Sequence, residues 1–75
     1  MEELLKILQD VDDEIDYEHE TAMIDDDIID SLKLLQIIAA LDDAYHIHID
    51  PSEMEPENFN TLQAIYDLVQ SYREK

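Results

Sequence analysis

The chain has 75 residues, and 21 acidic against 4 basic side chains give it a formal net charge of −17. A chain of this length has room for one domain, expected over residues 1–75, with a free energy of unfolding on the order of a few kcal/mol. It contains no Cys and no Gly, which excludes a disulfide framework, a thiolate zinc site, a P-loop and the nucleophile elbow of a hydrolase. Nucleic acids and anionic membranes attract Lys and Arg, so we expect no nucleic-acid partner, no membrane insertion, and partners with basic patches.

The apolar content of 45% is too high for a chain kept disordered by its charge, so we expect a folded protein. No apolar run approaches the length of a membrane span, and Met1-Glu2-Glu3 lacks the positive region of a signal peptide. The expected location is the cytoplasm.

Helical spacing of apolar residues predicts a first helix from Glu2 to Ile15. From Asp16 to Asp30 no stripe continues, and a connection this long is usually functional in a compact domain. We expect apolar side chains to pin it to the core at intervals: Tyr17, Met23, Ile24, Ile28 and Ile29.

A second helix is predicted to begin at Ser31, because the Asp30 carboxylate can accept a hydrogen bond from the first turn. Its apolar stripe runs uninterrupted to Tyr45 and includes Leu34, Ile37, Ile38 and Leu41. A narrower strip on an adjoining face is not required by a single buried face; it either packs under the loop or faces partners. This strip consists of Leu32, Leu35 and Ala39.

The remaining chain predicts two more helices. Ile47, Ile49 and Pro51 indicate an extended connection, and Pro56 is placed as the first residue of a short helix through Phe59. Asn60 is a candidate cap for the last helix, predicted from Thr61 to about Tyr72. The predicted fold is therefore all-α, a four-helix bundle with a short third helix and a long loop between the first two.

Ser31 is the first candidate for chemistry. At a helix start its hydroxyl would lie beside unpaired backbone N–H groups, where a phosphate ester is electrostatically favoured. The tripeptide Asp30-Ser31-Leu32 alone occurs by chance in many proteins, so its surroundings decide its weight.

Three segments give the chain a resemblance to the acyl and peptidyl carrier protein family. They are Asp30-Ser31-Leu32 with the apolar helix through Asp42, Asp43 and Tyr45; Ile47-His48-Ile49 before Pro51; and Phe59-Asn60-Thr61-Leu62-Gln63-Ala64-Ile65. The resemblance covers about residues 24 to 70 and implies the helical bundle of the acyl carrier protein type. It also implies 4′-phosphopantetheine on Ser31, with Asp30 and Leu32 beside it, transferred from coenzyme A by a phosphopantetheinyl transferase with Mg²⁺.

The resemblance implies a carrier protein with no catalytic residues of its own, acting as a monomer. The thiol of the arm would hold the cargo as a thioester, since the chain has no Cys. Its partners would be a loading ligase and acyltransferases or synthases. The candidate docking residues are Leu32, Leu35, Ala39, Asp26, Asp27, Asp42 and Asp43, with the charges accelerating encounter with basic partners.

The cargo stays open at this level. An acyl carrier of fatty-acid, polyketide or related synthesis is the leading hypothesis, although Lys33 and Gln36 occupy positions that are often acidic in fatty-acid synthase carriers. The alternative is an aminoacyl carrier, peptidyl or D-alanyl, since Asp27-Ile28-Ile29-Asp30-Ser31 is similar to the Gly-Leu-Leu-Asp-Ser pattern of stand-alone carriers, with Asp27 in place of Gly. Asn58-Phe59-Asn60-Thr61 favours the D-alanyl type, whereas Leu32 does not, because Phe is common there. A different class, an acidic adaptor for a basic protein, is the rival.

Other polar groups predict little chemistry. An EF-hand beginning at Asp25 would need Gly sixth and Glu twelfth, where this chain has Asp30 and Gln36. His46 and His48 lack a third ligand nearby, so we expect no metal site. His19 with Ser31 lacks the Gly-containing loop that would build an oxyanion hole.

Overall fold

Four α-helices form the framework of the computed structural model, which describes residues 2–74. They are α1 (Glu2–Val11), α2 (Ser31–Tyr45), α3 (Pro56–Phe59) and α4 (Leu62–Arg73), with one 3₁₀ turn, η1 (Pro51–Glu53). Residues 2–74 contain no strand, which confirms the all-α prediction. None of the helices described is both long enough and apolar enough to cross a membrane.

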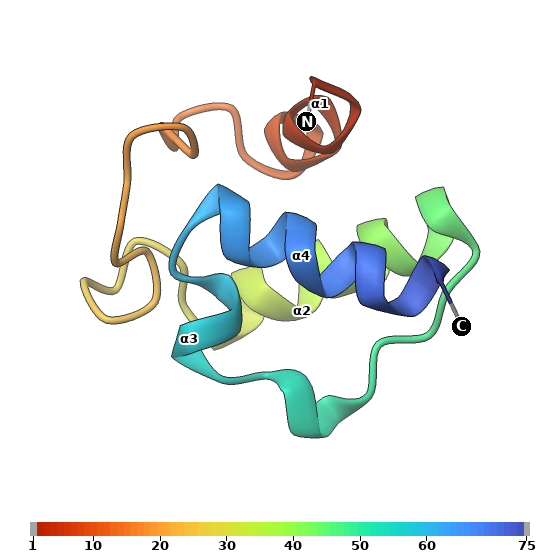
Figure 1. The fold of residues 1–75 in the computed structure, drawn as a ribbon. Coiled ribbons are helices and arrows are strands. Elements are labelled where there is room, and N and C mark those ends of the chain that lie inside the picture. The colour runs from red at the N-terminus through yellow and green to blue at the C-terminus, as the bar shows by residue number, and fades with distance from the viewer. Residues whose placement is uncertain (1, 75) are drawn as a thin grey trace.

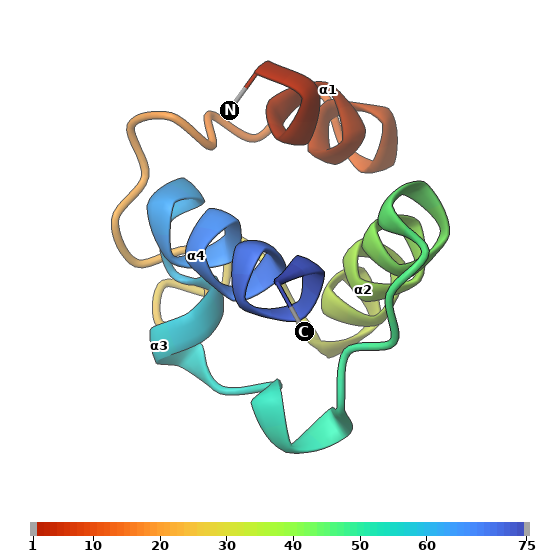
Figure 2. The same ribbon diagram turned by 45° about the vertical axis from the view of Figure 1, so that its right-hand side comes forward.

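The two longest helices, α2 and α4, run side by side in nearly the same direction, and α1 lies across them (Figures 1 and 2). Because α2 and α4 are parallel, the starts of both helices lie at one end of the bundle. The long loop 12–30 and α3 lie at that same end, near the start of α2. The fold therefore gathers residues from three separate parts of the sequence around the start of α2.

The first helix ends earlier than its apolar spacing predicts. It stops at Val11, so the expectation that it continues to Ile15 is wrong. The Asp12 carboxylate accepts a hydrogen bond from the Glu14 N–H at 3.0 Å, a local turn that competes with helix. The Tyr17 hydroxyl lies 2.9 Å from the Leu8 carbonyl and 2.8 Å from that of Asp12, so its single proton can be donated to one of these two carbonyls where α1 ends.

The second helix has the predicted boundaries. Asp30 is its N-cap, accepting a hydrogen bond from the Lys33 N–H at 2.8 Å. At the other end His46 takes the left-handed conformation, with φ of 56°, and its N–H donates to the Asp42 carbonyl. Such a left-handed residue is a common helix terminator, so His46 ends α2 even though it is not glycine.

The short third helix also matches its predicted range, Pro56–Phe59. The cap of α4 is Thr61, whose Oγ1 accepts a hydrogen bond from the Ala64 N–H at 3.0 Å. Asn60, the candidate cap, is therefore not the cap of α4. Its side chain contacts the loop before α2 instead.

One hydrophobic core joins the helices and both long connections. The predicted anchors Tyr17, Met23 and Ile29 are buried, and Ile24 and Ile28 pack partly buried against them. Burying such a side chain stabilises the fold by roughly 1.5–3 kcal/mol, so the loop 12–30 is held by its own apolar residues. The buried set is Leu4, Leu8, Tyr17, Met23, Ile29, Leu34, Ile37, Leu41, Ile49, Phe59, Ile65, Leu68 and Val69.

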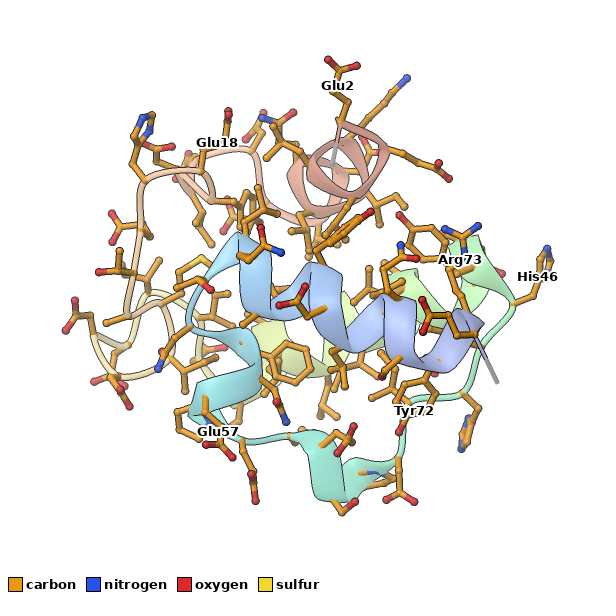
Figure 3. All side chains as sticks on the ribbon, viewed as in Figure 1. Glu2, Glu18, His46, Glu57, Tyr72 and Arg73 are labelled. Atoms are coloured by element: carbon orange, nitrogen blue, oxygen red, sulfur yellow. The ribbon has the colours of Figure 1, made fainter. Side chains whose placement is uncertain are left out.

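Polar contacts close the end of the bundle away from Ser31. The Arg73 guanidinium lies 5.0 Å from the centre of the Tyr45 ring, which joins the ends of α4 and α2. The Tyr72 hydroxyl accepts a hydrogen bond from the Asp50 N–H at 3.0 Å. Figure 3 shows Tyr72 and Arg73 at the end of α4 and His46 pointing outward beyond them.

Candidate attachment site at the start of α2

Ser31 differs in setting from the other two serines of the chain. It is exposed and opens a helix of fifteen residues, and its hydroxyl makes no hydrogen bond to any residue within 2–74. Ser52 lies in the single turn η1. The Ser71 hydroxyl, near the end of α4, donates to the Leu68 carbonyl at 2.7 Å. Ser31 is therefore the serine with an unengaged hydroxyl at the positive end of a long helix.

The residue before Ser31 organises the helix start. The Asp30 carboxylate satisfies the Lys33 N–H, and the Asp30 carbonyl accepts the first helical hydrogen bond, from the Leu34 N–H at 2.9 Å. Asp30 thus acts in the structure as the N-cap of α2, the role that the sequence predicts for it.

A small closed loop precedes this cap. The Ile29 N–H donates to the Met23 carbonyl at 2.9 Å, and both of these side chains are buried. Between them the acidic tip, defined as Asp25, Asp26 and Asp27, is exposed. Asp27 has φ of 58°, the left-handed region that favours glycine. The residue that replaces the usual Gly of stand-alone carriers therefore occupies a backbone conformation suited to Gly.

Next to Ser31 the surface has a depression of about 290 Å³. Loop residues Ile24 and Asp27 form part of its wall, and the rest of the lining comes from Ile29, Asp30, Ser31, Leu34 and Met54. The lining mixes apolar side chains with two carboxylates. A group attached to Ser31 would thus meet both kinds of surface at once.

The narrow apolar strip of α2 is exposed rather than buried under the loop. Leu32 is 66% exposed and Leu35 is 52% exposed, and Ala39 is exposed one turn further on. Leu32 and Leu35 are the large apolar residues with high exposure within 2–74. The strip therefore leaves apolar surface in contact with water, beside Ser31.

The acidic candidates divide into two groups. Asp26, Asp27 and Asp43 are exposed. Asp42 is only 25% exposed at its side chain, and its Oδ1 accepts a hydrogen bond from the Ile49 N–H at 3.1 Å. Asp42 thus holds the connection after α2, a structural role that spacing alone did not indicate.

Lys33 has a contact that the sequence did not predict. Its Nζ lies 3.1 Å from the Asp12 Oδ2, joining the start of α2 to the residue after α1. The pKa of the Asp12 carboxyl is lowered, first by the hydrogen bond from the Glu14 N–H and then by the Lys33 ammonium. The Lys33 side chain is 27% exposed.

All three histidines are exposed. His19 pairs with Asp16 at 2.8 Å in the loop, and this hydrogen bond with the nearby charge raises the pKa of the imidazole. His48 is 3.9 Å from Asp42, and its side chain is 91% exposed. Within residues 2–74 no three His, Cys, Asp or Glu side chains gather closely enough to hold a metal ion.

Asn60, a residue near the site, does not have the role of helix cap that the sequence predicts. Its side-chain Oδ1 accepts hydrogen bonds from the Ile24 N–H at 2.9 Å and the Asp25 N–H at 3.2 Å. Its Nδ2 donates to Asp25 Oδ2 at 3.1 Å. These partners lie more than thirty residues away in sequence, so no local pattern could have revealed them.

This arrangement of helices, with an exposed serine opening the second of them, agrees with the class of carrier domain that the sequence resembles. The chain matches the family described as "Phosphopantetheine attachment site" over residues 1–69, and it belongs to that family. Its prosthetic group is therefore 4′-phosphopantetheine, attached covalently, and the protein is a carrier domain. Carrier domains of this family are modified by phosphopantetheinyl transferases and interact with ligases and synthases.

Among curated proteins, the chain is similar to the D-alanyl carrier protein of Lactococcus lactis subsp. lactis (strain IL1403). The two are 29% identical over 76 residues, which cover 99% of this chain and 96% of that protein. No solved structure matches the chain.

Proposed function

We propose that Ser31 is the attachment residue for 4′-phosphopantetheine and that the protein presents a thioester on this arm to partner enzymes. The single observation behind the proposal is the exposed, unengaged Ser31 hydroxyl at the start of α2. Free N–H groups and the helix dipole at this position favour the negative phosphodiester that attachment creates.

The attachment reaction needs no group from this chain except the Ser31 hydroxyl. The Ser31 oxygen attacks the β-phosphorus of coenzyme A, and the bond from that phosphorus to the 3′,5′-adenosine bisphosphate breaks. The leaving group departs with the electron pair, and the hydroxyl proton passes to a base of the transferase. The arm supplies a thiol, which the chain otherwise lacks because it contains no Cys. The chain thus serves as a substrate and a carrier rather than as an enzyme.

Docking in this proposal uses the exposed strip of α2 with the acids around it. Leu32, Leu35 and Ala39 would contact apolar side chains of a transferase, ligase or synthase. Asp26, Asp27 and Asp43 would face basic residues, with Asp42 contributing its charge from a more enclosed position. Because opposite charges mainly speed encounter, added salt should lower the rate of modification more than the turnover number.

For the cargo we propose an aminoacyl group, loaded by an adenylating ligase. The similarity to a D-alanyl carrier over almost the whole of both chains supports this choice. The carboxylates of Asp27 and Asp30 in the depression beside Ser31 also suit the ammonium group of an aminoacyl thioester. Leu32 favours the second candidate, an acyl cargo, since D-alanyl carriers commonly have Phe after the serine.

The attachment is tested by intact mass after incubation with coenzyme A, Mg²⁺ and a broad-specificity phosphopantetheinyl transferase. The wild-type chain should gain the mass of one phosphopantetheine arm, and Ser31→Ala should gain nothing. An unmodified wild-type chain would contradict the proposal and favour an acidic adaptor for a basic protein.

The cargo is tested on the modified chain with two purified loading enzymes. A D-alanine-activating ligase with ATP should add one D-alanyl group as a thioester that hydroxylamine releases. An acyl carrier protein synthetase with a fatty acid is the comparison. Loading by the second enzyme alone would replace the aminoacyl cargo with an acyl one and leave the attachment proposal intact.

A further inference from the structure

Asn60 connects the junction between α3 and α4 to the loop that leads into Ser31. All four of its polar groups are engaged. The N–H donates to the Pro56 carbonyl at 2.8 Å, and the carbonyl accepts from the Met23 N–H at 3.1 Å. The side chain accepts hydrogen bonds from the N–H groups of Ile24 and Asp25 and donates one to the Asp25 carboxylate. Figures 1 and 2 show the two segments side by side at the same end of the bundle.

The chemistry of this contact requires an amide. Two adjacent N–H donors need an acceptor, and the Asp25 carboxylate needs a donor, and a single Asn side chain supplies both. Asp at this position would keep the acceptor but place a second negative charge against Asp25. Ala would leave both N–H groups without their partner.

Asn60 bonds the segment of chain that leads into Ser31. The segment from Met23 to Ile29 closes on itself, exposes the acidic tip, and continues directly into Asp30 and Ser31. Ile24, which bonds Asn60, is also part of the wall of the depression beside Ser31. The position of the tip relative to Ser31 therefore depends on a residue from the other end of the sequence.

We propose that Asn60 is a positioning residue for the modification of Ser31, because it fixes the acidic tip where the transferase must contact the chain. This inference rests on the proposed attachment at Ser31. Without the Asn60 contacts, only a fraction of molecules would have the tip in the conformation that the transferase binds. The apparent dissociation constant for the transferase then rises by the inverse of that fraction, whereas turnover of the bound complex changes little.

The test measures KM and kcat of phosphopantetheinyl transfer from coenzyme A to the full chain. Asn60→Ala should raise KM for the carrier by about 10-fold and leave kcat within about twofold of wild type. Amide hydrogen exchange at Ile24 and Asp25 should accelerate in the same variant, while the amides of α2 keep their protection.

Three further variants separate positioning from stability. Thr61→Ala removes the cap of α4 next to Asn60 but none of the loop contacts, so it should lower the thermal midpoint without raising KM. Asn60→Asp alone should raise KM, and adding Asp25→Asn should lower KM again, because the exchanged pair regains a donor and an acceptor. That double variant has the same formal charge as the wild-type chain, so general electrostatics cannot explain a rescue.

The outcomes distinguish the positioning role of Asn60 from the proposed attachment at Ser31. A wild-type chain that is modified on Ser31, together with an Asn60→Ala variant of unchanged KM, overturns the positioning role alone. The positioning role is also overturned if Thr61→Ala raises KM as much as Asn60→Ala does, or if the double variant is no better than Asn60→Asp. A wild-type chain that the transferase does not modify overturns both.

Discussion

The two apolar faces of α2 contain the same residue types in opposite settings. Leu34, Ile37 and Leu41 are buried in the core, with Ile37 fully enclosed. Leu32 and Leu35, on the adjoining face, remain 66% and 52% exposed. Helical spacing identifies both faces in the sequence, but the bundle needs only one of them. Apolar surface beyond what the core requires, next to the candidate attachment serine, is where contact with other proteins is to be sought.

A matched pair of truncations tests the difference between the two faces of α2. Ile37→Ala should lower the free energy of unfolding by about 3 kcal/mol, since it removes buried methyl groups and leaves a cavity. Leu35→Ala should change it by less than about 0.5 kcal/mol, as expected for an exposed residue. Urea denaturation followed by circular dichroism measures both, and equal losses would show that the two faces contribute equally to the core.

The loop 12–30 shows a similar division between buried and exposed residues, and Tyr17, at 1% exposed, is one of its buried members. Tyr17→Phe keeps the ring but removes the hydroxyl that donates a hydrogen bond to a carbonyl where α1 ends. We expect a loss of about 1 kcal/mol in the free energy of unfolding, measured at pH 7 by urea denaturation. No change would mean that water satisfies that carbonyl as well as Tyr17 does.

The same tyrosine gives the fold a limit at alkaline pH. Burial, reinforced by the charges of Asp12 and Asp13, raises the pKa of Tyr17 from 10.0 to about 12. The unfolded chain releases this proton near pH 10, whereas the folded protein keeps it. Stability from the neutral phenol is therefore complete below pH 10 and is lost as the pH rises toward 12. In Tyr17→Phe the fall in thermal midpoint between pH 9.5 and 11.5 should be shallower than in wild type.

The smallest expected effect concerns the exposed tip of the same loop. Asp27→Gly should raise the free energy of unfolding by about 0.5 kcal/mol, because Gly adopts positive φ without a Cβ clash, although it has more freedom when unfolded. Asp26→Gly removes the same charge at a position where φ is not positive, so it is the matched control. If both variants are equally stabilised, relief of charge repulsion, and not backbone conformation, is the cause.

Most of the framework could be predicted because its determinants are local. Asp30 and the uninterrupted apolar stripe define α2, and Pro56 marks the start of α3. The end of α1 could not be predicted from spacing. Ile15 continues the helical pattern, but the chain after Val11 forms other hydrogen bonds, through the Asp12 side chain and the Tyr17 hydroxyl, which apolar spacing does not reveal.

The candidate site also has some features that the local sequence predicts and others that it does not. The placement of Ser31 at a helix start follows from its neighbours in sequence. The contacts of Asn60 with Ile24 and Asp25, and of Lys33 with Asp12, join segments that only the folded chain brings together. Asn60 looked like a cap because Asn is a good cap residue, and nothing in the local sequence distinguishes that role from the one the structure shows.

We propose that the prosthetic group is attached to Ser31 and not to Ser52 or Ser71. Tandem mass spectrometry of peptides from the modified chain identifies which serine bears it. We expect the added phosphopantetheine mass on the peptide containing Ser31, with peptides containing Ser52 and Ser71 unchanged. Finding that mass on either of the other serines, while Ser31 stays unmodified, would contradict it.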